Sequence, residues 1–493
     1  MDREIELKFL IPPEAAERAL AGLPGEGETR RLDATYFDTP DHALRKAGFG
    51  LRVRDGDGGR KQTLKSGSAG GVFARGEWEE AVDGPAPDRK ALWRTPVAAI
   101  LEGRPLTPVF SAEVERTIRT VRAGDAVIEA ALDRGALSAG DRRAPICELE
   151  LELKSGAPAA LFDLARDIAR RAPLRLSLIS KAERGYDLAA GGRDLSFRPR
   201  AEPLDPHATV AETLQALGRA ALARLCEGLE AVRDHPEPDS VHQARVATRR
   251  LRALLKIFKP LARDEDARRL DDALDWLAGE FDNARDLDVF LGEVWAPAAS
   301  GAAFAGRPAF ETALQAAHAR AYIRVSAALQ DPRARDLLLD AAAWLEAGAW
   351  TTDPSLAPPR ERRARAYARE VLDHRLAQMR KGAKRFDDLD AHGRHRLRLK
   401  GKILRYAVED FAALFPDHPK RVARFVAAAK AAQDTLGALN DRAVQGALIQ
   451  ALAADDTALA RDAARIVLND DEEERLRAAE DALERLLDAK TFW

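Results

Sequence analysis

Charged and apolar residues alternate along several short segments of residues 1–200. The alternation runs through 4–9, 51–54, 76–79 and 147–154. A period of two is typical of antiparallel strands that have one apolar face. Segments rich in glycine, aspartate and serine separate these runs and predict turns between strands. This part of the chain is therefore predicted to form an antiparallel sheet.

The hydrophobic period changes after residue 200. Long segments rich in alanine, leucine and arginine follow, with apolar residues at helical spacing. Three short helices are also expected in the first part, over 13–21, 90–101 and 157–171. Proline-containing segments predict a linker and helix breaks, at 201–206, 235–238, 259–260, 296–297, 353–359 and 415–419. We therefore expect a multidomain α+β protein, with a sheet domain over 1–200 and an all-helical domain over 205–490.

Length and composition agree with two globular domains. The 493 residues exceed one ordinary hydrophobic core, and 46% of them are hydrophobic. Two isolated cysteines, Cys147 and Cys226, exclude a disulfide framework and a cysteine-rich zinc site. No apolar run reaches the roughly 18 residues that span a bilayer, and no apolar signal core opens the chain. A cytoplasmic protein without a membrane segment is expected.

Within each predicted strand, the charged residues lie in phase on one face. A solvated sheet face gives the same alternation, and for any single strand it is the simpler explanation. Here, however, most rows are nearly pure carboxylate or nearly pure cation, which stabilises an open sheet little. We therefore expect a closed, eight-stranded barrel whose charges line a tunnel and whose apolar side chains lie under covering helices. The rows are Glu4, Glu6 and Lys8; Arg52 and Arg54; Lys61 and Lys65; Glu77 and Glu79; Glu129 and Asp133; and Glu148, Glu150, Glu152 and Lys154.

Such a lining matches the chemistry of phosphoryl transfer. Carboxylates spaced two residues apart can jointly hold Mg²⁺ or Mn²⁺, which prefer oxygen ligands. Arginine and lysine rows can bind a chain of phosphates. The cations neutralise charge on the leaving phosphate, while a carboxylate or a metal ion orients the attacking water.

The segment 4–8, Glu-Ile-Glu-Leu-Lys, resembles the ExExK signature of the CYTH superfamily, the triphosphate tunnel metalloenzymes. A lone ExExK motif is weak, but the likeness continues in the family's order over most of residues 1–200. The further matching segments are 36–39, 51–54, 63–65, 77–79, 114–116, 128–135, 148–154 and 180–186. The resemblance implies an eight-stranded tunnel that hydrolyses triphosphates with a divalent metal, Mg²⁺ or Mn²⁺.

The resemblance also implies roles for individual residues, and it leaves open which carboxylate positions the water. The implied catalytic residues are Glu4, Glu6 and Lys8. The implied metal ligands are Glu4, Glu6, Asp133, Glu148 and Glu150, with Glu129 completing the acidic lining. The implied phosphate-binding residues are Lys8, Arg52, Arg54, Lys65, Arg116 and Lys181.

The helical part contains a cationic stripe that occurs twice. The first copy is a row at helical spacing, His242, Arg245, Arg249, Arg252, Lys256 and Lys259. The second copy is His395, Arg398, Lys402 and Arg405. Each copy is followed about 45 residues later by a predicted acidic turn, at 285–289 and 437–442. The repetition predicts a duplicated helical bundle.

A solvated helix with surface ion pairs would also carry charge on one face. Exposed helices usually alternate Glu and Lys at i,i+4, however, and this stripe lacks such pairs. Like charges at that spacing repel, so the face is expected to meet a polyanion or acidic side chains from elsewhere in the fold. How far Asp286 and Asp441 offset the charge is left open.

Together with segment 436–441, the two stripes resemble the CHAD domain, named for its histidines and helical fold, over about 205–490. This family is associated with binding inorganic polyphosphate through basic surfaces, and binding would be multivalent and salt-sensitive. The implied polyphosphate-binding residues are His242, Arg245, Arg249, Arg252, His395, Arg398, Lys402 and Arg405, and Lys256 extends the first stripe.

The leading hypothesis is a metal-dependent inorganic triphosphatase joined to a polyphosphate-binding module. One alternative binds polyphosphate in both halves without turnover. Another acts on a nucleoside or thiamine triphosphate, or cyclises ATP. Nucleic acid is not expected, because the net charge is −2 and aromatic residues, at 6%, do not interleave with the cationic stripes. A homodimer and an association with polyphosphate granules are left open.

Overall fold

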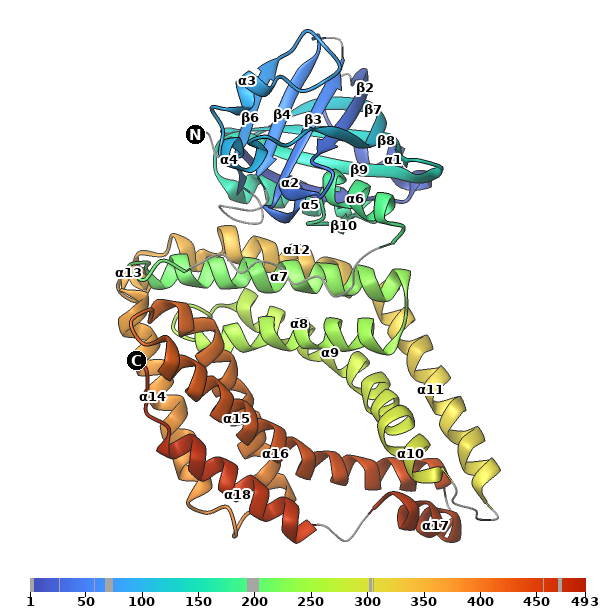
Figure 1. Ribbon diagram of the computed structural model, residues 1–493, viewed down its shortest axis with the longest axis vertical. Coiled ribbons are helices and arrows are strands. Elements are labelled where there is room, and N and C mark those ends of the chain that lie inside the picture. Colours follow the sequence, from blue (N-terminus) through green and yellow to red (C-terminus); the bar gives the residue numbers. More distant parts are fainter. Residues whose placement is uncertain are drawn as a thin grey trace. The chain divides into compact units, whose positions relative to one another are not determined.

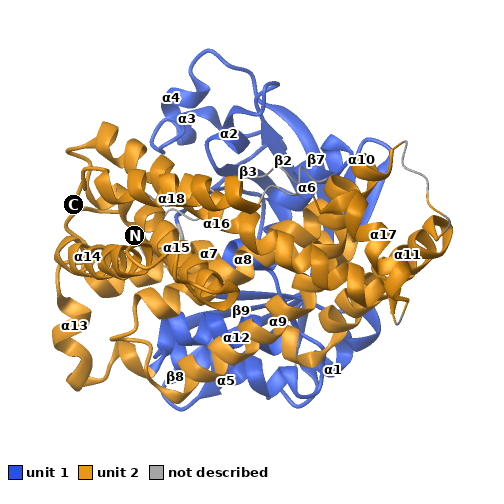
Figure 2. Ribbon diagram, turned by 90° about the horizontal axis from the view of Figure 1, so that it is seen from below, with its two compact units in different colours: residues 1–202, 222–227, 335–348 blue, residues 203–221, 228–334, 349–493 orange. Residues whose placement is uncertain are grey.

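The computed structural model describes residues 4–493 except 26, 57, 67–73, 193–203, 301–303, 305, 455 and 469–471, and it does not describe the side chains of residues 4, 74 and 75. The chain divides into two compact units (Figure 2). Unit 1 comprises residues 1–202, 222–227 and 335–348, and unit 2 comprises 203–221, 228–334 and 349–493. Part of the expected linker, 201–203, lies outside the described residues.

Unit 1 is built on one antiparallel sheet. Its strand order is β10-β1-β9-β8-β7-β2-β3-β4-β6, and β5 pairs with β1 off this path. Figure 1 shows the sheet curling, with β3, β4 and β6 in front of β8 and β9. The strands are β1 (Glu4–Leu10), β2 (Glu28–Asp38), β3 (Phe49–Asp55), β4 (Lys61–Ser66), β5 (Ala74–Arg75), β6 (Glu77–Ala81), β7 (Thr107–Ala123), β8 (Ala126–Ala139), β9 (Arg142–Ser155) and β10 (Arg175–Leu176).

The expected closed, eight-stranded barrel is not what the strand order shows. The described sheet has ten strands, two of them only two residues long, and its order is an open path from β10 to β6. Only Gly76 separates β5, which pairs with β1, from β6, which pairs with β4. Alternation along a strand identifies its two faces, but closure depends on stagger across the whole sheet, which no single strand encodes.

Helices cover the apolar faces of the sheet. Helix α6 (Lys181–Ala190) brings Tyr186 onto a cluster that includes Tyr36 of β2 and Phe110 of β7. Leu92 and Leu101 cover apolar side chains of β2, β3 and β4. The other helices of this region are α1 (Ala16–Leu20), α2 (Ala43–Lys46), α3 (Arg89–Leu92), α4 (Ala98–Leu101) and α5 (Pro158–Ala169).

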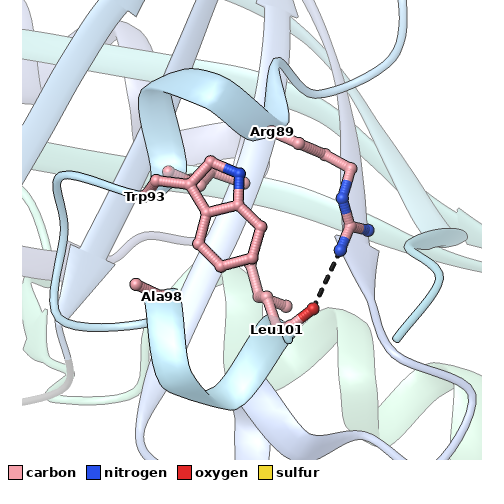
Figure 3. Close-up of a pocket in the computed structure, with 5 residues that line it drawn as sticks. Arg89, Trp93, Ala98 and Leu101 are labelled. Carbon is pink, nitrogen blue, oxygen red and sulfur yellow. Dashed lines mark hydrogen bonds between the residues drawn. The ribbon is translucent and has the colours of Figure 1, made fainter. Parts of the chain in front are cut away.

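The helix expected over 90–101 is in fact two short helices, α3 and α4. Pro96 lies between them and has no amide hydrogen to continue a helix. Arg89 of α3 joins the pair by donating to the carbonyl of Leu101, at 2.8 Å (Figure 3). The Trp93 indole lies over Ala98 and Leu101 and is 48% exposed. The lining of this pocket is mainly apolar and carries no group of catalytic or metal-binding side chains, so the two helices serve to cover the sheet.

The rest of the described chain is helical. Segments 285–289 and 437–442, expected as turns, lie inside helices α9 and α16, because packing overrides the weak helix propensity of glycine, asparagine and aspartate. The helices are α7 (Val210–Asp234), α8 (Pro238–Ile257), α9 (Glu265–Val289), α10 (Ala296–Ala299), α11 (Arg307–Gln330), α12 (Pro332–Ala347), α13 (Ala357–Glu361), α14 (Ala364–Ala383), α15 (Ala391–Phe411), α16 (Pro419–Ala453), α17 (Thr457–Val467) and α18 (Glu472–Asp488).

Two further expectations about the helices were wrong. The break at 296–297 is absent, because a π-helical turn, Phe290–Trp295, leads directly into α10, which contains Pro297. Helix α8 ends at Ile257, so Lys259 does not continue the first stripe. Among the described helices, none combines the length and the apolar character needed to cross a membrane.

Candidate functional site

Six charged side chains gather on one face of the sheet, and we call them the buried charge cluster. Its centre is the ammonium of Lys181, at the start of α6. Lys181 Nζ lies 2.6 Å from Asp133 Oδ2 and 2.9 Å from Glu150 Oε1, and it also contacts Glu148 Oε1. The members are Lys8, Arg116, Asp133, Glu148, Glu150 and Lys181.

Arg116 and Lys8 complete the cluster. Arg116 donates two parallel hydrogen bonds to Asp133, both at 2.7 Å, and a further one to Glu150. Lys8 Nζ lies 3.2 Å from Glu150 Oε1. Two-pronged pairing of this kind fixes the guanidinium plane and is among the stronger interactions of charged side chains.

Strand register explains why these residues meet. Asp133 of β8 stands opposite both Arg116 of β7 and Glu148 of β9. Lys8 of β1 stands opposite Glu150 of β9. Side chains at a spacing of two share a face, so four neighbouring strands place their charges together. The sequence predicted this shared face for β1, β8 and β9 but not for β7, and the pairing of the strands turns separate rows into one cluster.

The centre of the cluster is removed from solvent, whereas the Arg116 side chain at its edge stays 19% exposed. Glu148 is 0% exposed and Asp133 is 1% exposed. Burial alone favours the neutral form of Glu150, yet Lys181, Arg116 and Lys8 together hold the pKa of this carboxyl well below its usual range. Burial also opposes the charge on Lys181, but the three carboxylates raise the pKa of its ammonium. Buried charges persist only when they are paired in this way.

The acidic members fit a hard divalent cation. Asp133, Glu148 and Glu150 each offer one ligand atom, and these atoms all lie within 4.8 Å of one another. Three carboxylate oxygens form a donor set that Mg²⁺ and Mn²⁺ prefer. These residues are three of the five metal ligands that the sequence resemblance implies.

The predicted phosphate-binding residues of β3 and β4 lie outside the cluster. Arg54 Nη2 is 3.6 Å from Glu79, and Lys65 Nζ is 3.3 Å from Glu77. The Arg52 guanidinium donates to the Tyr36 hydroxyl at 3.5 Å. Arg52 stands opposite Tyr36 of β2, which stands opposite Phe110 of β7, six residues before Arg116, so Arg52 and Arg116 share one face of the sheet.

The remaining predicted residues of unit 1 are less central. Glu6 lies at the edge of the cluster, 3.9 Å from Lys8 Nζ. The side chain of Glu4 lies outside the described residues. Glu129 lies 3.9 Å from Lys154, away from the cluster. Arg184, which pairs with Glu148, is not among the site residues predicted from the sequence. Its position three residues after Lys181, one helical turn on, was the available signal.

Helix α6 is held by three kinds of contact. Ser180 and Glu183 form a capping box at its N-terminus. The Tyr186 hydroxyl donates to Asp38 Oδ2 at 2.8 Å. Gly185 packs so closely on the Phe110 ring that a Cβ atom at this position would lie 2.0 Å from it. Lys181 is thereby presented to the carboxylates from a fixed backbone.

We expect Gly185→Ala to destabilise unit 1 by about 1–3 kcal/mol, because the added methyl group overpacks this contact. The melting temperature, measured by circular dichroism on the full chain, should fall by several degrees. Gly279→Ala is the matched control, since Gly279 lies inside α9 with nothing within 4 Å of the added carbon. A Gly185→Ala protein as stable as the Gly279→Ala protein would contradict this packing.

In unit 2, four cations from the two stripes lie together, and we call them the helical basic cluster: Arg245, Arg249, Arg398 and Lys402. Helices α8 and α15 are in contact, since Arg250 donates to Asp410 at 2.7 Å. Asp282 of α9 accepts from Arg245 at 2.6 Å and from Arg249 at 2.7 Å. Asp441 of α16 lies 3.8 Å from Arg398. The two copies of the motif therefore converge on one site.

Lys402 has the most perturbed environment of this cluster. Burial, together with Arg249, Arg398 and Arg245, lowers the pKa of its ammonium to about 7. In the part of the chain that the structure describes, no carboxylate lies within 4.0 Å of Lys402 Nζ. Burial raises the pKa of Asp286, an effect that Arg245 opposes and Asp282 reinforces. Lys402 thus lies among arginines.

The other residues of the two stripes lie apart from the helical basic cluster or serve helix contacts. Arg252 pairs with Asp271 at 2.6 Å and with Asp275. Burial and the neighbouring Arg252 lower the pKa of Lys256. Arg405 pairs with Glu409 at 3.0 Å, an i,i+4 pair within α15. These carboxylates therefore offset part of the positive charge of the two stripes.

The two histidines have different surroundings. His395 Nδ1 lies 2.6 Å from Asn440 Oδ1 of α16. His242 Nδ1 is buried without a hydrogen-bond partner among the described residues. Burial, Arg285 and Arg245 lower the pKa of His242. The His395 ring therefore contacts α16, whereas burial beside two arginines disfavours the charged form of His242.

Comparisons with known proteins find two families along the chain, in the order that the sequence resemblances imply. Residues 2–186 match the model of the CYTH domain, and residues 216–450 match the model of the CHAD domain. The crystal structure of the CHAD domain from the plant Ricinus communis aligns with a TM-score of 0.50 and 29% identity, covering 60% of this chain and 97% of that chain.

Two curated relatives match parts of the chain. An inorganic triphosphatase of Haemophilus influenzae is 34% identical over 197 residues, which cover 38% of this chain and 56% of that protein. An uncharacterized protein of Mycobacterium tuberculosis (strain CDC 1551 / Oshkosh) is 28% identical over 313 residues, which cover 58% of each chain. The chain thus spans less than two thirds of the length of these relatives.

Proposed function

Because this chain carries a CYTH domain followed by a CHAD domain, we propose that it hydrolyses inorganic triphosphate with a divalent metal and binds polyphosphate through its helical part. The observation that carries the first half is the buried charge cluster. The cluster buries cations and carboxylates together, and in the absence of a ligand they pair with one another. The cations of the cluster complement the negative charge of triphosphate, and its carboxylates complement the positive charge of the metal.

On substrate binding, the cations and the carboxylates of the buried charge cluster exchange partners. Lys8, Arg116 and Lys181 turn to phosphate oxygens, and the arginine contributes two parallel donors. Arg52, Arg54 and Lys65 extend the phosphate-binding face along β3 and β4. Removing the site from water strengthens each of these interactions at the leaving phosphate.

Asp133, Glu148 and Glu150 would hold Mg²⁺ or Mn²⁺, which would neutralise charge on the phosphates and lower the pKa of bound water. Glu6, at the edge of the cluster, joins this acidic set in our proposal, as does Glu4. The chain's own contribution is to orient the substrate between fixed cations, so that little rearrangement is needed during the reaction.

The test is phosphate release from inorganic triphosphate by the purified full chain, with and without Mg²⁺ or Mn²⁺. We expect release only with the metal, and faster release than from a nucleoside triphosphate, thiamine triphosphate or long polyphosphate. Faster turnover of a nucleoside or thiamine triphosphate would move the assignment to that substrate. Tight binding of triphosphate without release under any metal would favour a non-catalytic binding protein.

The helical basic cluster supports the second half of the proposal. It brings four cations from two helices to one place, against carboxylates that only partly offset them. A polyphosphate chain supplies closely spaced negative charges that such a site can bind, with release of counterions. Retention of the full chain on immobilised polyphosphate across a salt series tests this, and salt-independent retention would contradict it.

Polyphosphate binding should strengthen as the pH falls toward 7. Burial and three arginines lower the pKa of Lys402 to about 7, so its ammonium is charged below that pH and largely neutral above it. A bound polyanion favours the charged form. The affinity should therefore fall above pH 7, by at most about tenfold per pH unit for one linked proton.

The control for this pH dependence is Lys402→Arg, which stays charged throughout and should flatten the profile. The measurement is the dissociation constant for polyphosphate from pH 6 to 9 at fixed ionic strength. Identical profiles for the wild-type and Lys402→Arg proteins would show that another group titrates.

A further inference from the structure

We propose that the Lys181 ammonium occupies the position of the divalent cation in the resting site and leaves it when triphosphate binds, so that metal and triphosphate bind together. This inference rests on the proposed function and adds an order of binding to it. Its basis is the position of Lys181 Nζ among the carboxylates.

One oxygen from each of three predicted metal ligands touches this ammonium. The contacts are Asp133 Oδ2 at 2.6 Å, Glu150 Oε1 at 2.9 Å, and Glu148 Oε1. The same three residues supply the ligand atoms that lie within 4.8 Å of one another. A metal ion and the ammonium therefore compete for the same oxygens.

The remaining oxygens of the three carboxylates are also occupied. Asp133 Oδ1 accepts from Arg116 Nε, and Glu150 Oε2 accepts from the Arg116 Nη2. Glu148 Oε2 pairs with Arg184. A divalent cation that arrives alone finds every carboxylate paired and several positive charges nearby, and burial strengthens the repulsion. Metal binding without triphosphate is therefore disfavoured.

Triphosphate removes this obstacle because it offers the ammonium a new anionic partner. Lys181 is the first residue of α6, and the capping box of Ser180 and Glu183 fixes its backbone. Four rotatable side-chain bonds let Nζ move toward phosphate while the helix stays in place. The carboxylates are then left facing the metal. Each ligand raises the affinity for the other, as reciprocal coupling requires.

The test measures Mn²⁺ binding to the full chain by electron paramagnetic resonance of the free ion, without turnover. Wild-type protein should bind Mn²⁺ weakly alone and at least about tenfold more tightly with a non-hydrolysable imido analogue of triphosphate. Lys181→Met should bind Mn²⁺ alone at least about tenfold more tightly than wild type, and the analogue should add little. Lys90→Met is the control, because Lys90 is an exposed residue of α3 and not a member of the cluster, and its loss should change neither value.

Equal Mn²⁺ affinity of wild-type and Lys181→Met proteins in the absence of the analogue would overturn the proposal. Lys181→Arg keeps the charge and guards against misfolding, and it should bind Mn²⁺ alone no more tightly than wild type. Because the readout is metal binding, it is separate from hydrolysis. Wild-type protein that shows the coupling but releases no phosphate would refute the proposed function and leave the order of binding intact.

Discussion

Glu150→Gln is expected to reduce the rate of triphosphate hydrolysis by about 10²–10³-fold, the largest catalytic loss we anticipate. Glu150 contacts Lys181, Arg116 and Lys8, and it belongs to the group of three carboxylates. The amide keeps the shape of the side chain but removes one anionic ligand and the partner of three cations. Phosphate release, measured over a range of Mg²⁺ and Mn²⁺ concentrations, checks the expectation.

The matched control is Glu80→Gln. Glu80 lies on β6 and pairs with the exposed Arg94 at 2.9 Å. The same chemical change there should alter the rate less than about threefold, because a partly exposed ion pair contributes little. Circular dichroism at the assay temperature shows whether the Glu150→Gln protein is folded. Equal rates for the two folded variants would exclude the buried charge cluster as the active site.

Replacing Arg245 and Arg398 together by alanine is expected to weaken polyphosphate binding by about 100-fold at low salt, the largest loss of binding we anticipate. The two residues come from the two copies of the motif and belong to one cluster. Each lost phosphate contact removes about one unit from the salt slope, so the double variant should bind with a slope shallower by about two. Filter binding across a salt series measures both quantities.

The control for this loss is Arg268→Ala with Arg269→Ala, which removes the same charge from the first turn of α9. Both arginines are about two-thirds exposed and pair with Glu265 and Asp266. This control should shift affinity only slightly. Triphosphate hydrolysis should survive in the Arg245 and Arg398 variant, and equal loss of both activities would contradict the proposed division of labour.

The local patterns predicted the elements well where one physical signal dominated. The alternation in 147–154 identified β9, and the 3.6-residue period of the first stripe identified α8, whose apolar residues Ala244, Leu251 and Leu254 are buried. Proline-containing segments correctly predicted the helix ends at 235–238 and 259–260. Pro297 is different, because the π-helical turn Phe290–Trp295 leads the helix directly into α10.

Charge partners across elements were not predictable from local sequence. Arg245 and Arg249 form a like-charged row along α8, yet both pair with Asp282 of α9. Arg184 is an ordinary helical arginine in the sequence, and only the docking of α6 brings it to Glu148. Such contacts depend on the relative placement of elements, which spacing along one element does not encode.

The sequence by itself determined which residues share a strand face or a helix stripe, because side-chain direction follows from the two- and 3.6-residue periods. It thereby identified the charged rows of unit 1 and the duplicated stripe of unit 2. Only the tertiary structure decided that Lys181 meets Asp133, Glu148 and Glu150, that the strand order is an open path, and that Lys402 lies among arginines. Strand register and helix packing arise from the burial of apolar side chains far apart in the chain, and they set which charges become neighbours.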